Sequence, residues 1–178
     1  MRPLASLIAL VFLIAPASAQ YSMAPLTIES NEPRPMVTAA DPQAVAALLR
    51  KHGFETEIET QPTGAVVIHT QSRDAGFGLY FQACTETLTE CEVITFSSGF
   101  DFDTPQLPDV LGRWNSTRFS KAYLNGDGDP FVEFSINMKH GVSEENFIDS
   151  LTWFTTEIAA FIEQIGWTGD VEDHTQPI

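Results

Sequence analysis

The fold is decided by residues 143–165, which read SEENFIDSLTWFTTEIAAFIEQI. Six large apolar residues recur in this stretch at steps of three or four. They are Phe147, Leu151, Phe154, Ile158, Phe161 and Ile165. That spacing places them on one face of an α-helix, which begins after Ser143 as N-cap and ends at Gly166. A stripe with three phenylalanines must be buried, and we expect the helix to cover one face of a β-sheet.

Six segments before this helix are predicted to be strands of that sheet. They are residues 54–61, 65–70, 77–84, 91–98, 119–124 and 131–139. In the last pair, Ala122 and Phe134 fall on an apolar side, whereas Lys121 and Glu133 fall on a polar side. This alternation is typical of an antiparallel sheet with one buried face and one face toward water.

Two shorter helices complete the predicted fold. Asp41 as N-cap and Pro42 at the first helical position begin one helix, and Gly53 ends it. The other helix carries apolar residues from Leu107 to Trp114. The order is helix, four strands, helix, two strands, helix. We therefore expect an α+β fold, an antiparallel sheet of about six strands with its helices packed on one face.

The two cysteines, Cys84 and Cys91, end one predicted strand and begin the next. If they lie opposite each other, the apolar residues of both strands coincide on one face, with Phe81 beside Ile94. In an oxidising compartment such a pair forms a disulfide, and the spacing does not fit a redox CxxC motif. We predict a structural bridge across a hairpin.

The first residues have the pattern of a secretory signal peptide. Arg2 precedes an apolar run, residues 4–15, and the small residues 17–19 follow. This run is too short to span a bilayer, which needs about 20 apolar residues. We expect a periplasmic or secreted protein without integral membrane association after cleavage. The predicted parts are a signal peptide at 1–19, a flexible linker at 20–40, the folded domain at 41–166 and a disordered acidic tail at 167–178.

The chain is strongly acidic, with 9 Lys and Arg against 24 Asp and Glu and a formal net charge of −15. Removal of Arg2 with the leader makes the charge −16. A field of this sign repels nucleic acid and anionic lipid, and it suits a basic partner or cations. Acidity also serves simply to keep an exported protein soluble.

One turn has the beginning of a calcium loop. Oxygen-bearing side chains recur at Asn125, Asp127 and Asp129, but Pro130 and Ile136 stand where such a loop needs glycine and glutamate. An Asn/Asp/Gly hairpin turn explains the same residues without metal. We keep Asn125, Asp127 and Asp129 as weak metal candidates and expect no cofactor.

No catalytic constellation is visible in the sequence. The four histidines, His52, His69, His140 and His174, are scattered over different predicted elements. Asp101 and Asp103 form a carboxylate pair in a loop, but no third catalytic partner is evident near them. The sequence therefore favours a protein that is not an enzyme.

A set of short motifs in the second half of the chain resembles the YbjN-domain family, which is described as bacterial sensory transduction regulators. The motifs are Trp114-Asn115, Arg118-Phe119, Ala122-Tyr123-Leu124, Asp127-Gly128-Asp129 and Gly141-Val142-Ser143. The resemblance covers about residues 41–165 and includes Gly53-Phe54. It implies a fold like that of type III secretion chaperones, with helices on one face of an antiparallel sheet, and it supplies no catalytic residues.

The polar side of the sheet is the candidate site. Its predicted residues are Tyr80, Gln82, Thr95, Tyr123, Glu133, Ser135 and Asn137. We expect a non-enzymatic binding or regulatory module of the cell envelope, whose polar face takes a protein, a peptide or a second copy of the chain. The same face could also simply be solvated.

Two further functions stay open. An exported metal-binding protein or hydrolase would use carboxylates or histidines in a cleft. An acidic inhibitor or chaperone of a basic envelope protein would use the net charge, and salt should then weaken its binding.

Overall fold

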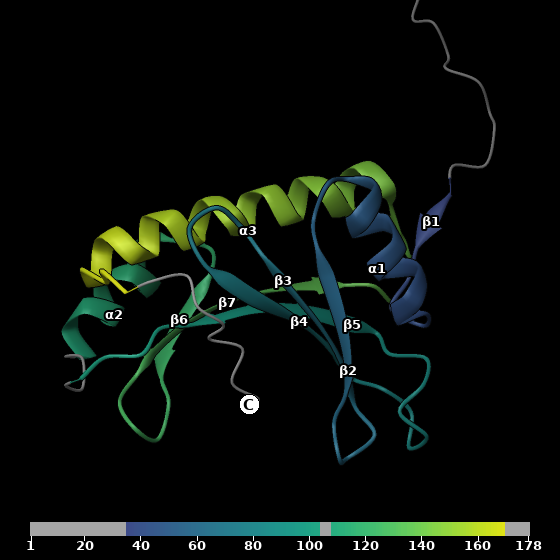
Figure 1. The fold of residues 1–178 in the computed structure, drawn as a ribbon, viewed down its shortest axis with the longest axis horizontal. Coiled ribbons are helices and arrows are strands. Elements are labelled where there is room, and N and C mark those ends of the chain that lie inside the picture. Colours follow the sequence, from purple (N-terminus) through teal and green to yellow (C-terminus); the bar gives the residue numbers. More distant parts are fainter. Residues whose placement is uncertain (1–34, 104–107, 170–178) are drawn as a thin grey trace, which may run out of the picture. The chain divides into compact units, whose positions relative to one another are not determined.

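The computed structural model describes residues 35–103 and 108–169. The expected signal peptide at 1–19, residues 20–34 of the expected linker, Leu107, His174 and the tail from residue 170 lie outside the described residues. The described chain is an α+β fold in which helices cover one face of an antiparallel sheet (Figure 1). The predicted fold class is confirmed.

The main sheet has six strands in the order β2-β3-β4-β5-β7-β6, and all neighbours are antiparallel. The strands are β2 Thr56–Thr60, β3 Val66–Gln71, β4 Gly76–Gln82, β5 Val93–Gly99, β6 Lys121–Leu124 and β7 Pro130–Asn137. The β6–β7 hairpin attaches through β7, so the shorter strand β6 lies at the edge. The sequence predicted this hairpin but not its place in the sheet.

The long helix α3, Glu144–Ile165, lies across the sheet as predicted. All six residues of its apolar stripe are buried. Phe154 meets the ring of Phe77 on β4 with 5.5 Å between centroids, and Phe147 meets Phe96 on β5 at 6.0 Å. Ser143 accepts a hydrogen bond from the backbone N–H of Asn146, and Gly166 ends the helix with a φ of 69°.

The two shorter helices lie at opposite edges of the sheet (Figure 1). Helix α1, Pro42–Lys51, packs beside β2 and β3, and helix α2, Pro108–Thr117, packs beside β6 and α3. Asp41 caps α1 by accepting two backbone N–H bonds, as predicted. Leu49 of α1 and Trp114 of α2 are buried in the same hydrophobic core as the apolar side chains of α3. The helices therefore share one face of the sheet.

The fold extends beyond both predicted boundaries of the domain. Strand β1, Met36–Val37, pairs with β8, Val142–Ser143, and Ala39 is buried, so the end of the expected linker belongs to the fold. At the other end, Trp167 is buried against Phe100. Both features depend on partners far away in the sequence, which local patterns do not reveal.

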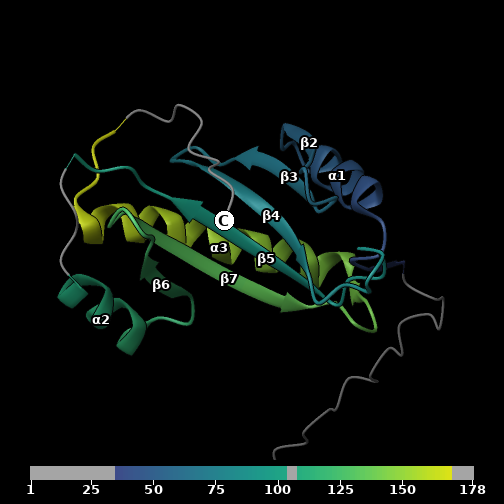
Figure 2. The same cartoon turned by 90° about the horizontal axis from the view of Figure 1, so that it is seen from below.

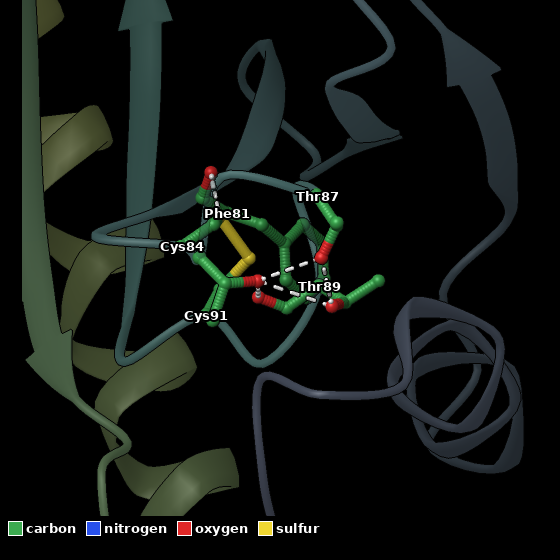
Figure 3. Close-up of a disulfide and its surroundings, with 6 residues drawn as sticks. Phe81, Cys84, Thr87, Thr89 and Cys91 are labelled. Atoms are coloured by element: carbon green, nitrogen blue, oxygen red, sulfur yellow. Dashed lines mark hydrogen bonds between the residues drawn. A yellow bond between two sulfur atoms is a disulfide. The ribbon is translucent and has the colours of Figure 1, made fainter.

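Cys84 and Cys91 form the predicted disulfide at the end of the β4–β5 hairpin (Figure 3). The register is the one that the apolar pattern predicted, with Phe81 opposite Ile94 and Tyr80 opposite Thr95. The bridge closes the loop that connects these two central strands.

Candidate partner-binding face

The side of the main sheet away from α3 is the candidate site, and we name it the helix-free face (Figure 2). The strand register places Tyr80 opposite Thr95, and Thr95 opposite Ser135, along one row. Each of these residues alternates with core residues such as Leu79 and Phe96, which face the helix. The structure therefore brings together the residues that the alternation predicted for the polar face.

Two glycines let aromatic rings lie flat on this face. A Cβ atom at Gly78 would come within 2.7 Å of the Tyr80 ring, and one at Gly99 within 2.5 Å of the Phe131 ring. Tyr123 stacks on Phe131, with 5.5 Å between centroids and 16° between planes. We name Tyr80, Tyr123 and Phe131 the aromatic platform. The rings can lie flat because Gly78 and Gly99 beneath them have no side chains.

Glu133 is the polar centre of this face. Its carboxylate accepts a hydrogen bond of 2.7 Å from the Tyr123 hydroxyl and one of 3.5 Å from Ser97. The ammonium group of Lys121 lies 3.8 Å from the same carboxylate and 4.7 Å from the centroid of the Tyr123 ring. The bond to Glu133, the Lys121 ammonium group and the stacked Phe131 ring together hold the Tyr123 ring in place.

The two phenols of the platform are held in their protonated form. Burial raises the pKa of the Tyr80 hydroxyl, and the negative charges of Glu59 and Glu133 raise it further. Burial also raises the pKa of Tyr123, followed by the hydrogen bond to Glu133 and its charge. Both hydroxyls therefore stay hydrogen-bond donors at any physiological pH.

Thr95 lies on the helix-free face but is not open to solvent, because only 2% of its surface is exposed. Its hydroxyl hydrogen-bonds the side chains of Gln82 and Ser135, both at 2.8 Å. Gln82, Ser135 and Asn137 are exposed. Alternation predicted the correct side for Thr95, but burial there depends on its cross-strand neighbours.

The calcium-like turn is built by its own hydrogen bonds. The side-chain oxygen of Asn125 accepts bonds from the backbone N–H groups of Asp127 and Asp129, at 3.0 and 2.8 Å. One oxygen of Asp129 accepts a bond from the backbone of Phe102. The side chains of Asn125 and Asp129 thus act as acceptors within the turn and the neighbouring loop. Within residues 35–103 and 108–169 no group of His, Cys, Asp and Glu has metal-binding geometry.

The histidines of the described chain stay apart. His69 contacts Glu59 on the neighbouring strand at 2.7 Å, and His52 contacts Glu144 at 3.0 Å. His140 is exposed in the turn before β8. These contacts join elements of the fold and form no shared cleft.

Sequence reasoning missed an ion pair between the buried Glu157 of α3 and the partly exposed Arg118, which directly follows α2. Glu157 is 2% exposed and accepts bonds from Arg118 at 3.0 Å and from the Ser120 hydroxyl at 2.5 Å. Trp114 donates its ring N–H to Ser120, and Arg118 lies over the Trp114 ring. The available signal was a glutamate next to the apolar stripe of the helix, between Phe154 and Ile158.

Comparison with protein families identifies the family of this chain. The YbjN family model, described as "Putative bacterial sensory transduction regulator", matches residues 41–167. No curated protein matches the chain. Where the structure is described, none of the helices combines the length and apolar character that crossing a membrane requires.

Proposed function

The chain belongs to the YbjN family, which is described as a regulator and not as an enzyme, and we propose that it is an exported regulatory module. In this proposal the helix-free face binds a protein or peptide partner. The family description supports the regulatory role. The geometry of the aromatic platform supports the choice of surface.

The observation that carries the proposal is the prearranged order of the platform. Tyr123 is fixed by Phe131, Glu133 and Lys121, and Tyr80 lies flat over Gly78. Rigid aromatic side chains lose little conformational entropy on binding, and tyrosines are enriched where interfaces gain most of their energy. A platform that is already ordered suits a partner surface better than a merely solvated sheet.

The charge of this face indicates the chemistry of the partner. Glu57 and Glu59 on β2 are exposed on the same side of the sheet as Tyr80. The whole chain carries a net charge of −15. A partner segment with lysine or arginine would meet carboxylates and aromatic rings together, which favours cation–π contacts. Raising the salt concentration should weaken such binding.

Export is part of the same proposal. The apolar run at residues 4–15, followed by small residues, fits a cleaved leader. The disulfide between Cys84 and Cys91 is the kind of bond that persists in oxidising compartments. Alkylation of the cysteines in extracts made with and without reductant would show whether the bridge forms in the cell.

Photo-crosslinking tests the surface. A photoreactive amino acid placed at Gln82 or Ser135, both exposed on the helix-free face, should give one discrete adduct in cells. The matched control positions are Thr152 and Thr156, exposed on the solvent side of α3. Adducts from all four positions alike, or from none, would contradict the proposal. An adduct of twice the mass of the chain would identify a second copy as the partner.

A further inference from the structure

Strand β6 covers only half of the outer edge of β7. It pairs with residues from Pro130 to Glu133, whereas β7 continues to Asn137. Phe100 donates its backbone N–H to Pro130, so the even-numbered residues of β7 bond to β5 and the odd-numbered ones point outward. Within the described chain, no strand lies opposite the outward backbone groups of Ser135 and Asn137.

Side-chain contacts explain why β6 begins so late. The Ser120 hydroxyl donates to Glu157 on α3, and Trp114 donates to Ser120. These bonds hold the chain against the helix just before Lys121, where the strand starts. The bonds of Ser120 to Glu157 and to Trp114 therefore keep the second half of the β7 edge uncovered.

Exposed aromatic side chains border this uncovered edge on the helix side. Phe119 is 62% exposed and Trp153 is 57% exposed, with 5.5 Å between their ring centroids. Phe119 also meets Phe134 of β7 at 5.9 Å. We name these three residues the aromatic ledge. Two large, exposed aromatic residues in mutual contact are a common mark of an interaction surface.

We propose that the β7 edge binds the extended carboxyl-terminal segment of another protein. Such a segment would pair with Ser135 and Asn137 as an added strand and lay alternate apolar side chains on the aromatic ledge. This site uses the outward backbone N–H and C=O groups of Ser135 and Asn137 at the edge of the sheet, whereas the helix-free face presents the side chains of these residues. It therefore goes beyond the proposed function.

Charge and direction identify the carboxyl end. A strand antiparallel to β7 runs in the same direction as β6, so its last residue meets the chain at Arg118 and Phe119. Arg118 donates a hydrogen bond to Glu157 and lies over the Trp114 ring, but a guanidinium has five N–H donors, and the side chain is 41% exposed. Lys121 follows at the start of β6. These cations stand out in a chain with a net charge of −15 and suit a terminal carboxylate.

A second copy of the chain fits this edge poorly. In the symmetric antiparallel register that pairs Ser135 of one copy with Asn137 of the other, Lys139 would lie opposite Glu133, where Lys121 already pairs. The two lysines would compete for one place and repel each other. A short peptide that ends before Lys121 avoids this crowding.

Hydrogen exchange with defined peptides tests the proposal. The probe is a pool of eight-residue peptides that alternate threonine with valine, leucine or phenylalanine and end in a free carboxylate. We expect the pool to slow amide exchange at Ser135 and Asn137 about tenfold. The same pool with a carboxamide end should bind about tenfold more weakly, because it lacks the charge that Arg118 receives.

Substitutions on the ledge supply the controls. Trp153→Ala should abolish the protection, whereas Thr152→Ala, exposed on the same helix, should leave it unchanged. Thermal melting of both variants checks that they fold. Equal binding of the two pools, binding of neither, or protection only at Gln82 and Tyr80 would overturn the proposal. So would protection of Ser135 and Asn137 by dimerisation without peptide.

Discussion

The hydroxyl of Tyr123 donates a 2.7 Å hydrogen bond to Oε1 of Glu133, from the edge strand β6 to its neighbour β7. This bond holds the Tyr123 ring parallel to Phe131, which in turn lies over Gly99. A carboxylate, two rings and a glycine thus form one layer on the helix-free face. Removing any of them should change the platform in a predictable way.

Tyr123→Phe should make the protein less sensitive to alkaline pH. The folded state raises the pKa of Tyr123, so its contribution to stability is complete below the unfolded pKa near 10. Above that pH only the unfolded chain ionises, and the free energy of unfolding falls. Urea unfolding between pH 8 and 11 should therefore show a steeper decline for the wild type than for the variant. Parallel declines would contradict the assignment.

Gly99→Ala should displace the Phe131 ring, because the added Cβ would lie 2.5 Å from two ring carbons. Overpacking of this kind costs about 1–3 kcal/mol, which urea unfolding would measure. Gly112→Ala is the matched control, since no atom lies within 4 Å of its added Cβ on helix α2. That variant should be neutral or slightly more stable. Equal losses for both variants would rule out a specific role for Gly99.

Replacing Cys84 and Cys91 together by serine should destabilise the fold modestly. The bridge spans a sequence separation of 7, and so short a loop has a small closure entropy. We expect a loss of about 2 kcal/mol, measured by urea unfolding of the variant and of the oxidised wild type. Reduction of the wild type should give the same loss. A reduced protein as stable as the oxidised one would show that the bridge has no structural role.

Glu144→Gln should alter the stability in acid. Hydrogen bonds from Lys51 and His52 lower the pKa of Glu144 in the folded state. Its contribution is therefore present above the ordinary carboxyl pKa and is lost as the pH falls through the lower folded value. The wild type should exceed the variant at pH 6, and the two should converge near pH 2. A difference that persists in strong acid would contradict this ion-pair origin.

The sequence could predict those features that depend on local periodicity. The spacing of the apolar residues from Phe147 to Ile165 places them on one helix face, and this face is buried as predicted. The register of β4 and β5 could be predicted because Cys84 and Cys91 fixed the alignment of two alternating strands. Both inferences use only neighbours within one element or one hairpin.

Features that depend on distant pairing could not be predicted. The strand Met36–Val37 exists only because Val142–Ser143 lies beside it, and Trp167 is buried by Phe100. The uncovered edge of β7 depends on the hydrogen bond between Ser120 and Glu157, which are 37 residues apart in the sequence. For the same reason the pattern identified the side on which Thr95 lies but not its burial.

The binding of the crosslinked partner to the glycine variants tests the central claim most directly. The partner identified from position 82 would be purified, and its dissociation constant measured by calorimetry with the wild type, Gly99→Ala and Gly112→Ala. The account predicts that Gly99→Ala binds about tenfold or more weakly, because its platform is no longer flat, and that Gly112→Ala binds like the wild type. Equal affinity of all three proteins, with Gly99→Ala still folded, would contradict the claim that the aromatic platform binds the partner.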